Sequence, residues 1–91
     1  MAKKTDDNQS KIVKALRQIG ASVFTTHSIG KGFPDIVVGY RSINYLIEIK
    51  DGSKPPSRRK LTPDEEIFHR TWSGKVHVVN DENEAIKIIT Q

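Results

Sequence analysis

Apolar residues recur at helical spacing near the start of the chain. Between residues 9 and 19, the apolar positions that share one face are Ile12, Val13, Leu16 and Ile19. This spacing predicts an amphipathic helix from Gln9 to Ile19. Gly20 follows at once, and a glycine in that place is a common helix end. The mostly polar residues 1–8 are expected to form a frayed N-terminus.

Three segments after this helix have the pattern of strands. The predicted strands span residues 21–26, 35–40 and 45–50. The second holds a β-branched run, and the third alternates apolar and polar residues as a half-buried strand does. Residues 27–34 contain two glycines and a proline and predict a loop, and residues 41–44 predict a turn. The second and third strands are therefore expected to pair as a hairpin.

A second helix has a clear start signal in the sequence. Thr62 stands at the capping position, Pro63 at the first helical position and Glu65 at the third. Together these residues form a capping box, which satisfies backbone donors at the start of a helix. Gly74 is expected to end this helix.

The remaining segments complete an α/β pattern. Residues 75–79 predict a fourth strand, and Asp81 with Glu84 predicts the start of a last helix. The order α-β-β-β-α-β-α predicts an α/β fold with a central mixed sheet flanked by helices. A length of 91 residues suits one core, so residues 1–91 are expected to be a single domain.

Composition narrows the classes of function. The chain has 15 Lys and Arg residues against 11 Asp and Glu residues, a net charge of +4 that favours an acidic partner. The absence of cysteine excludes disulfides, thiolate metal sites and a cysteine nucleophile. The sequence contains no long apolar run and no signal-peptide pattern, so an intracellular (cytoplasmic) protein without a membrane partner is expected.

Positive charge is concentrated in one glycine-, serine- and proline-rich segment. Within residues 51–61 the basic side chains are Lys54, Arg58, Arg59 and Lys60. This composition predicts a mobile basic loop, whose charge suits contact with a phosphate backbone. Lys31, between Gly30 and Gly32, is a further candidate phosphate contact.

Three polar residues occupy strand positions where apolar residues would be ordinary. Asp35 opens the second strand, and Glu48 and Lys50 share one face of the third because they are two residues apart. A hairpin between these strands would bring Asp35 beside Glu48. Two carboxylates suit a hard divalent cation, with the backbone carbonyl of Ile49 as a further ligand. Lys50 would then orient a water molecule or stabilise charge on a phosphate.

Each part of this pattern has an ordinary alternative. An Asp at a strand start and a Glu-x-Lys on a strand face occur often as solvated edge residues. The predicted adjacency of the strands, with a glycine loop before them and a basic loop after, favours the catalytic interpretation. Two other hypotheses stay open: a non-catalytic DNA-binding module that uses the basic loop, and an interaction subunit whose polar trio is a surface ion cluster.

The pattern resembles the PD-(D/E)xK nuclease signature, and the element order resembles the restriction-endonuclease-like core of that superfamily. Within it, the chain is similar to the short stand-alone form of the VRR-NUC family over residues 9–89. The stretches that carry this likeness are Gly32-Phe33-Pro34-Asp35-Ile36-Val37-Val38-Gly39, Tyr45-Leu46-Ile47-Glu48-Ile49-Lys50, Leu61-Thr62-Pro63 and Gly74-Lys75-Val76-His77-Val78-Val79.

The resemblance implies an endonuclease that cleaves DNA with Mg²⁺ or Mn²⁺. It implies Asp35 and Glu48 as metal ligands and Lys50 as the residue that positions the attacking water. It further implies a homodimer that acts on branched DNA such as Holliday junctions, in a protein of phage or bacterial type.

Two positions depart from the pattern of the VRR-NUC family. Members often carry a Glu on the first helix near the metal, where this chain has Gln9, with Asp6 or Asp7 a turn earlier. Gln9 is thus either a weaker metal ligand or an exposed residue at the helix start, and the sequence leaves both open. Glu65 stands where Gln is common in the family, and the capping box accounts for it without a functional role.

The aromatic residues allow two interpretations. Phe24, Phe68 and Trp72 could stack on nucleic-acid bases. Their positions in the predicted strand and helix favour the protein core or a dimer interface instead.

Overall fold

The structure is a computed structural model that describes residues 7–91. In these residues the predicted order α-β-β-β-α-β-α is confirmed. The helices and strands are α1 (Asp7–Gln18), β1 (Ser22–Thr25), β2 (Ile36–Tyr40), β3 (Ile43–Ile49), α2 (Pro63–Thr71), β4 (His77–Val79) and α3 (Glu82–Thr90). None of the helices in residues 7–91 is long and apolar enough to span a membrane.

The strands form one mixed sheet, as predicted, in the order β1-β2-β3-β4. β1 and β3 both run antiparallel to β2, and β4 runs parallel to β3. The predicted hairpin of β2 and β3 is confirmed, but its turn is shorter than the predicted residues 41–44. Arg41 and Ser42 alone make the turn, because both have positive φ angles of 50° and 68° that let Tyr40 pair directly with Ile43.

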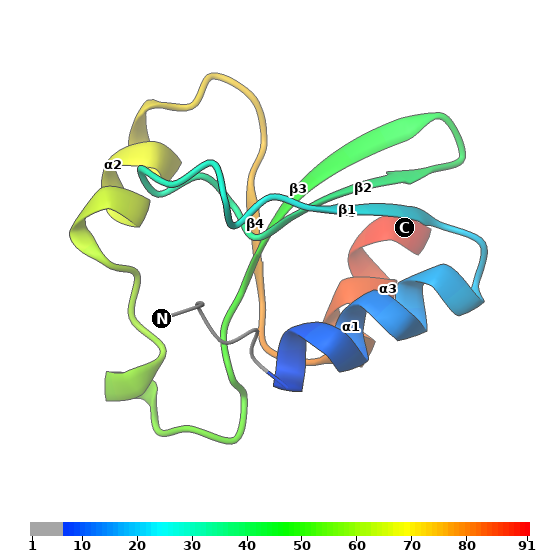
Figure 1. Ribbon diagram of the computed structural model, residues 1–91, viewed down its shortest axis with the longest axis horizontal. Coiled ribbons are helices and arrows are strands. Elements are labelled where there is room, and N and C mark those ends of the chain that lie inside the picture. Colours follow the sequence, from blue (N-terminus) through cyan, green and yellow to red (C-terminus); the bar gives the residue numbers. More distant parts are fainter. Residues whose placement is uncertain (1–6) are drawn as a thin grey trace.

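One face of the sheet is covered by α1 and α3, which lie side by side (Figure 1). The fully buried apolar side chains between these layers include Ile12, Leu16, Ile36, Val38, Ile47, Val79 and Ala85. The helix α1 begins at Asp7, two residues before the predicted start, and ends at Gln18 instead of Ile19. Of the predicted frayed N-terminus, residues 1–6 lie outside the described part of the chain.

The helix α2 stands apart from α1 and α3, at the end of the molecule opposite the β2–β3 hairpin (Figure 1). It has no buried residue. Its contact with the loop before β2 is aromatic, since Phe68 packs edge-on against Phe33 with ring centroids 5.3 Å apart. Phe68 also stacks on Trp72, with ring centroids 5.0 Å apart. This aromatic contact holds α2 near the end of the sheet.

The prediction of a core position for the three aromatic residues is wrong. Phe24 is 78% exposed, because it lies on the face of edge strand β1 that α1 and α3 do not cover. Trp72 is 45% exposed and Phe68 is half-buried on α2. A dimer interface, the other part of this interpretation, stays a prediction.

Candidate active site

Asp35 and Glu48 lie next to each other at one end of the sheet. The pairing of Ile36 with Ile47 in the antiparallel ladder places the preceding Asp35 opposite Glu48. Oδ2 of Asp35 accepts a hydrogen bond of 2.8 Å from the amide of Ile49, which fixes the carboxylate against β3. The predicted adjacency of the two acids therefore follows from the register of the hairpin.

Glu48 is a buried acid with one oxygen left without a partner. Its side chain is 2% exposed, and Oε1 has no hydrogen-bond partner among the described residues. Burial raises the pKa of Glu48 to about 10, and the neighbouring carboxylates of Asp35 and Glu65 add to the increase. An unpartnered acid of this kind is costly in a protein interior unless a proton or a cation neutralises it.

Lys50 connects Glu48 to α2. Its Nζ atom lies 3.8 Å from Oε2 of Glu48 and donates a hydrogen bond of 2.7 Å to Oε1 of Glu65. The same oxygen of Glu65 accepts from the amide of Thr62, and the Glu65 amide donates to Oγ1 of Thr62 in return. The predicted capping box is thus confirmed. The capping box alone does not explain Glu65, because this carboxylate also belongs to the charged cluster around Lys50.

The electrostatics of Glu65 differ from those of Glu48. Partial burial acts to raise its pKa, but the hydrogen bonds from Lys50 and the Thr62 amide outweigh burial and hold the pKa of Glu65 below its ordinary value. Glu65 is therefore the closer, ionised partner of Lys50 at 2.7 Å, while Glu48 lies 3.8 Å from the same Nζ through Oε2 and keeps Oε1 without a hydrogen-bond partner among the described residues. Sequence analysis missed this role, because no local pattern places the start of α2 beside the end of β3.

Asn8 is a second residue that sequence analysis missed. Its Nδ2 atom donates hydrogen bonds to the carbonyl oxygens of Lys50, at 2.6 Å, and of Asn80, at 3.1 Å. These bonds tie the first turn of α1 to the segments that follow β3 and β4. Asn8 belongs to the segment that was predicted to be frayed, and nothing in the sequence of that segment indicates these contacts.

A comparison with known proteins yields one solved structure with this architecture. No known protein-family model matches the chain, and no curated protein sequence matches it. A solved structure described as a "VRR_NUC domain" superposes with a TM-score of 0.57 at 22% sequence identity, over 91% of this chain and 90% of that one. The chain has the fold of a VRR_NUC domain. This finding confirms the predicted fold class.

The acids of this VRR_NUC fold fit a hard divalent cation. The hydrogen bond from the Ile49 amide uses only Oδ2 of Asp35, and the other oxygen of that carboxylate takes no part in it. Oε1 of Glu48 is buried and has no hydrogen-bond partner among the described residues. Within residues 8–91, no three His, Cys, Asp or Glu side chains form a group that could hold a metal ion. A cation here would therefore depend on two carboxylates, a main-chain oxygen and water, which is a donor set typical of Mg²⁺.

Gln9 is 7% exposed, so the alternative of an exposed residue at the helix start is wrong. Its side chain lines a groove between α1 and Thr25 of β1. No hydrogen bond joins it to Asp35 or Glu48 in the described part of the chain, and a role as metal ligand stays a prediction. Asp6 and the side chain of Asp7 lie outside the described structure.

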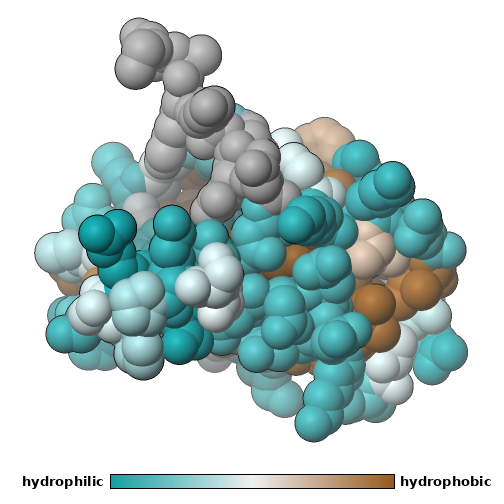
Figure 2. Space-filling model, turned by 90° about the horizontal axis from the view of Figure 1, so that it is seen from below, coloured by the Kyte–Doolittle hydropathy of each residue, from teal (hydrophilic) through white to brown (hydrophobic). Residues whose placement is uncertain are grey.

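The basic loop of residues 51–61 leaves the site directly after Lys50. It contains a short 3-10 helix, Pro56–Arg58, and its basic side chains Lys54, Arg58 and Lys60 are exposed, as is Lys31 in the loop before β2. Arg59 is half-buried, and its Nε atom has no hydrogen-bond partner among the described residues. Hydrophilic residues predominate on the face of the molecule seen from below, where this loop lies, with apolar residues between them (Figure 2).

Proposed function

We propose that this protein is a metal-dependent endodeoxyribonuclease whose active site is Asp35, Glu48 and Lys50. The observation that carries the proposal is the pairing of Asp35 with the buried carboxyl of Glu48, whose Oε1 has no hydrogen-bond partner among the described residues and whose Oε2 faces Lys50. Neither a DNA-binding module nor an interaction surface needs two carboxylates at this place. Such acids repel phosphate unless a cation lies between them.

Asp35 and Glu48 would hold Mg²⁺ or Mn²⁺ together with the carbonyl oxygen of Ile49, and Gln9 is a further proposed ligand. A bound cation supplies Lewis-acid polarisation of the phosphate and a water of lowered pKa. Lys50 orients that water and stabilises the negative charge that develops on the phosphate. Glu65 keeps Lys50 in place, since it accepts the 2.7 Å hydrogen bond from Nζ.

The basic residues near this site would hold the DNA backbone. Lys31 precedes Asp35 in the chain, and Lys54, Arg58, Arg59 and Lys60 follow Lys50. Phosphate contacts of this kind position the duplex without reading its sequence. We therefore expect affinity that falls steeply with salt and little base preference.

The finer specificity that we propose is for branched DNA, such as a Holliday junction, cut by a homodimer. It is supported by the resemblance to stand-alone VRR-NUC proteins. A dimer would present two active sites to the two strands that a junction resolvase must cut. The exposed aromatic residues Phe24 and Trp72 are available for a contact between protomers.

The test is a cleavage assay on a labelled four-way junction and a linear duplex of matching sequence, each with Mg²⁺, Mn²⁺ or EDTA. A Lys50→Ala variant runs alongside, and Lys87→Ala on the exposed side of α3 is the control for loss of a lysine. We expect metal-dependent cutting of the junction by the wild-type protein and by Lys87→Ala, and none by Lys50→Ala.

Other outcomes separate the parts of this proposal. Equal cutting of the duplex would keep the nuclease and remove the preference for branched DNA. Tight DNA binding that EDTA does not change, with no cutting in either metal, would replace it with a non-catalytic DNA-binding module.

A further inference from the structure

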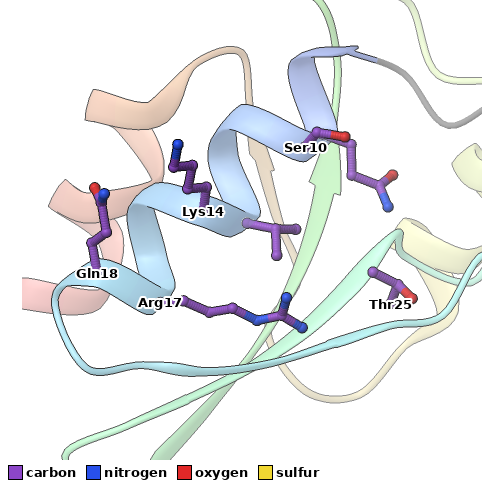
Figure 3. Close-up of a pocket in the computed structure, with 7 residues that line it drawn as sticks. Ser10, Lys14, Arg17, Gln18 and Thr25 are labelled. Atoms are coloured by element: carbon purple, nitrogen blue, oxygen red, sulfur yellow. The ribbon is translucent and has the colours of Figure 1, made fainter.

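A groove of about 490 Å³ lies between α1 and Thr25 of β1, and no residue of the basic loop lines it. Val13 is among the residues that line it, and Arg17 extends from α1 across the groove toward the strand that carries Thr25 (Figure 3). Lys14 and Gln18 stand on the helix side of the groove and project away from the strand. The groove is therefore an open channel with one wall of helix and one of strand.

The groove is basic. Lys14 and Arg17 line it, and no acidic residue of the described chain does. No ion pair joins either cation to an acidic group between residues 8 and 91. Nη2 of Arg17 donates a hydrogen bond of 3.0 Å to the carbonyl oxygen of Val23, which holds the guanidinium group over the groove. The other guanidinium donors remain for an anionic ligand.

One end of the groove lies at the candidate active site. Thr25, which lines the groove, precedes Thr26, whose amide donates a hydrogen bond of 2.9 Å to the carbonyl oxygen of Asp35. Gln9 lines this same end, one residue after Asn8, which bonds to the carbonyl oxygen of Lys50. From Gln9 to Gln18 the helix rises about 13 Å. The groove thus leads away from Asp35 and Glu48, and its length matches that of a few nucleotides of one DNA strand.

We propose that this groove binds the sugar–phosphate backbone of DNA on one side of the scissile bond, with Arg17 and Lys14 as the phosphate contacts. This inference rests on the proposed function, since it places the reacting phosphate at Asp35 and Glu48. The basic loop of residues 51–61 follows Lys50 at the end of β3 and extends away from α1 (Figure 1). The substrate is therefore held on both sides of the bond that is cut.

A polynucleotide fits the groove better than a small anion does. Arg17 extends across the groove toward β1 whereas Lys14 projects away from that strand, so the two charged groups do not converge on one point (Figure 3). Polar groups at Gln9, Thr25 and Gln18 line the two ends of the groove. An isolated phosphate would need several donors that point to one position.

The test compares DNA binding and DNA cleavage in one set of variants. The binding of a labelled duplex and a labelled junction is followed by fluorescence anisotropy between about 50 and 200 mM salt. The variants are Lys14→Gln, Arg17→Gln and the double variant, with Lys87→Gln on α3 as the matched loss of charge outside the groove. Lys14→Gln breaks no hydrogen bond of the described structure, so weaker DNA binding by this variant would report the lost charge and not a loss of folding. Lys14→Arg keeps the positive charge and is the conservative control.

We expect the double variant to bind DNA about tenfold more weakly and the slope of log K against log salt to fall by about two, one for each cation removed from the groove. The kcat of the double variant should stay within about twofold of wild type while its KM rises. Lys14→Arg should keep most of the DNA affinity that Lys14→Gln loses. Binding by the double variant equal to that of Lys87→Gln would overturn the inference and leave the nuclease intact. A wild-type protein that binds DNA without cutting it would end the proposed nuclease, while the binding comparison would still decide the role of the groove.

Discussion

Nζ of Lys50 donates a hydrogen bond of 2.7 Å to Oε1 of Glu65, although the two residues come from different elements. Lys50 directly follows the strand that carries Glu48, and Glu65 stands in the first turn of α2. The same Glu65 oxygen caps α2 by accepting from the Thr62 amide. A residue that stabilises the start of a helix is therefore also the partner of the proposed catalytic lysine.

Glu65→Gln and Glu65→Ala should separate these two roles. Gln keeps an oxygen acceptor for Lys50 and Thr62, so we expect its kcat to stay within about threefold of wild type. Ala removes both hydrogen bonds, so we expect a loss of about 1 kcal/mol in the free energy of unfolding and a kcat about tenfold lower. The measurements are urea unfolding and DNA cleavage kinetics. A Glu65→Ala protein with wild-type kcat would show that Lys50 does not depend on Glu65.

Glu48→Gln should stabilise the metal-free protein at neutral pH. The pKa of Glu48 is raised from its ordinary value of 4.5 to about 10 in the folded state. The folded state therefore binds more protons than the unfolded state between these values, so stability falls as the pH rises across this window. Gln carries no charge at any pH. We expect it to raise the free energy of unfolding near pH 8 by about 1–3 kcal/mol and to flatten its pH dependence.

The same variant tests the proposed cation by a route that needs no DNA. Mg²⁺ should raise the melting temperature of the wild-type protein, because a ligand that binds only the folded state stabilises it. Glu48→Gln should lose most of this increase. If Mg²⁺ raised the melting temperature of the wild-type protein and of Glu48→Gln equally, the cation would bind at a site other than Glu48.

Asn8→Ala should weaken the protein and displace Lys50. The substitution removes the hydrogen bonds to the carbonyl oxygens of Lys50 and Asn80, at a cost of about 1–2 kcal/mol in the free energy of unfolding. We expect kcat to fall as well, because the end of β3 loses its anchor on α1. Asn83→Ala, at an exposed position of α3, is the matched control and should change neither quantity. Equal effects of the two substitutions would refute the anchor.

Gly32→Ala should be more harmful than Gly30→Ala, although both glycines have positive φ angles, of 78° and 75°. A Cβ at Gly32 would collide with the backbone carbonyl of Asp64 in α2, whereas a Cβ at Gly30 meets nothing within 4 Å. We expect Gly30→Ala to cost about 1 kcal/mol for the left-handed backbone. Gly32→Ala should cost at least about 1 kcal/mol more. Chemical denaturation of both variants measures the difference, and equal stabilities would exclude the close contact between this loop and α2.

Local patterns predicted much of the fold. Helical spacing at Ile12 and Leu16 and the capping box at Thr62 each depend on a few neighbouring residues, and each is confirmed. Alternation predicted the strand β3, which is present, but burial along it does not alternate, since Ile47, Glu48 and Ile49 are all buried. The pairing of β2 with β3 was also predictable, but the exact register that sets Asp35 opposite Glu48 depends on the two-residue turn, because a turn of residues 41–44 would shift the pairing. This turn was not predictable, since Arg41 and Ser42 adopt positive φ angles that their residue types do not favour.

The contacts that the sequence concealed are long-range. The bonds of Asn8 to Lys50 and of Lys50 to Glu65 join residues 42 and 15 positions apart, which no periodicity encodes. Glu65 already had a sufficient local explanation in the capping box. The apolar strand around Phe24 favoured a core position, but β1 lies at the sheet edge with only one face covered.

The most direct test of the proposed active site is the single-turnover rate of DNA cleavage in Asp35→Asn, Glu48→Gln and the double variant, with Mg²⁺. Asn and Gln keep the shape of each side chain and remove its charge. We predict that each single variant loses at least about 100-fold in rate and that the double variant loses little more, because residues that act as one unit are not additive. Wild-type rates in either single variant, or cutting by the wild-type protein that persists in EDTA, would contradict a cation held jointly by Asp35 and Glu48.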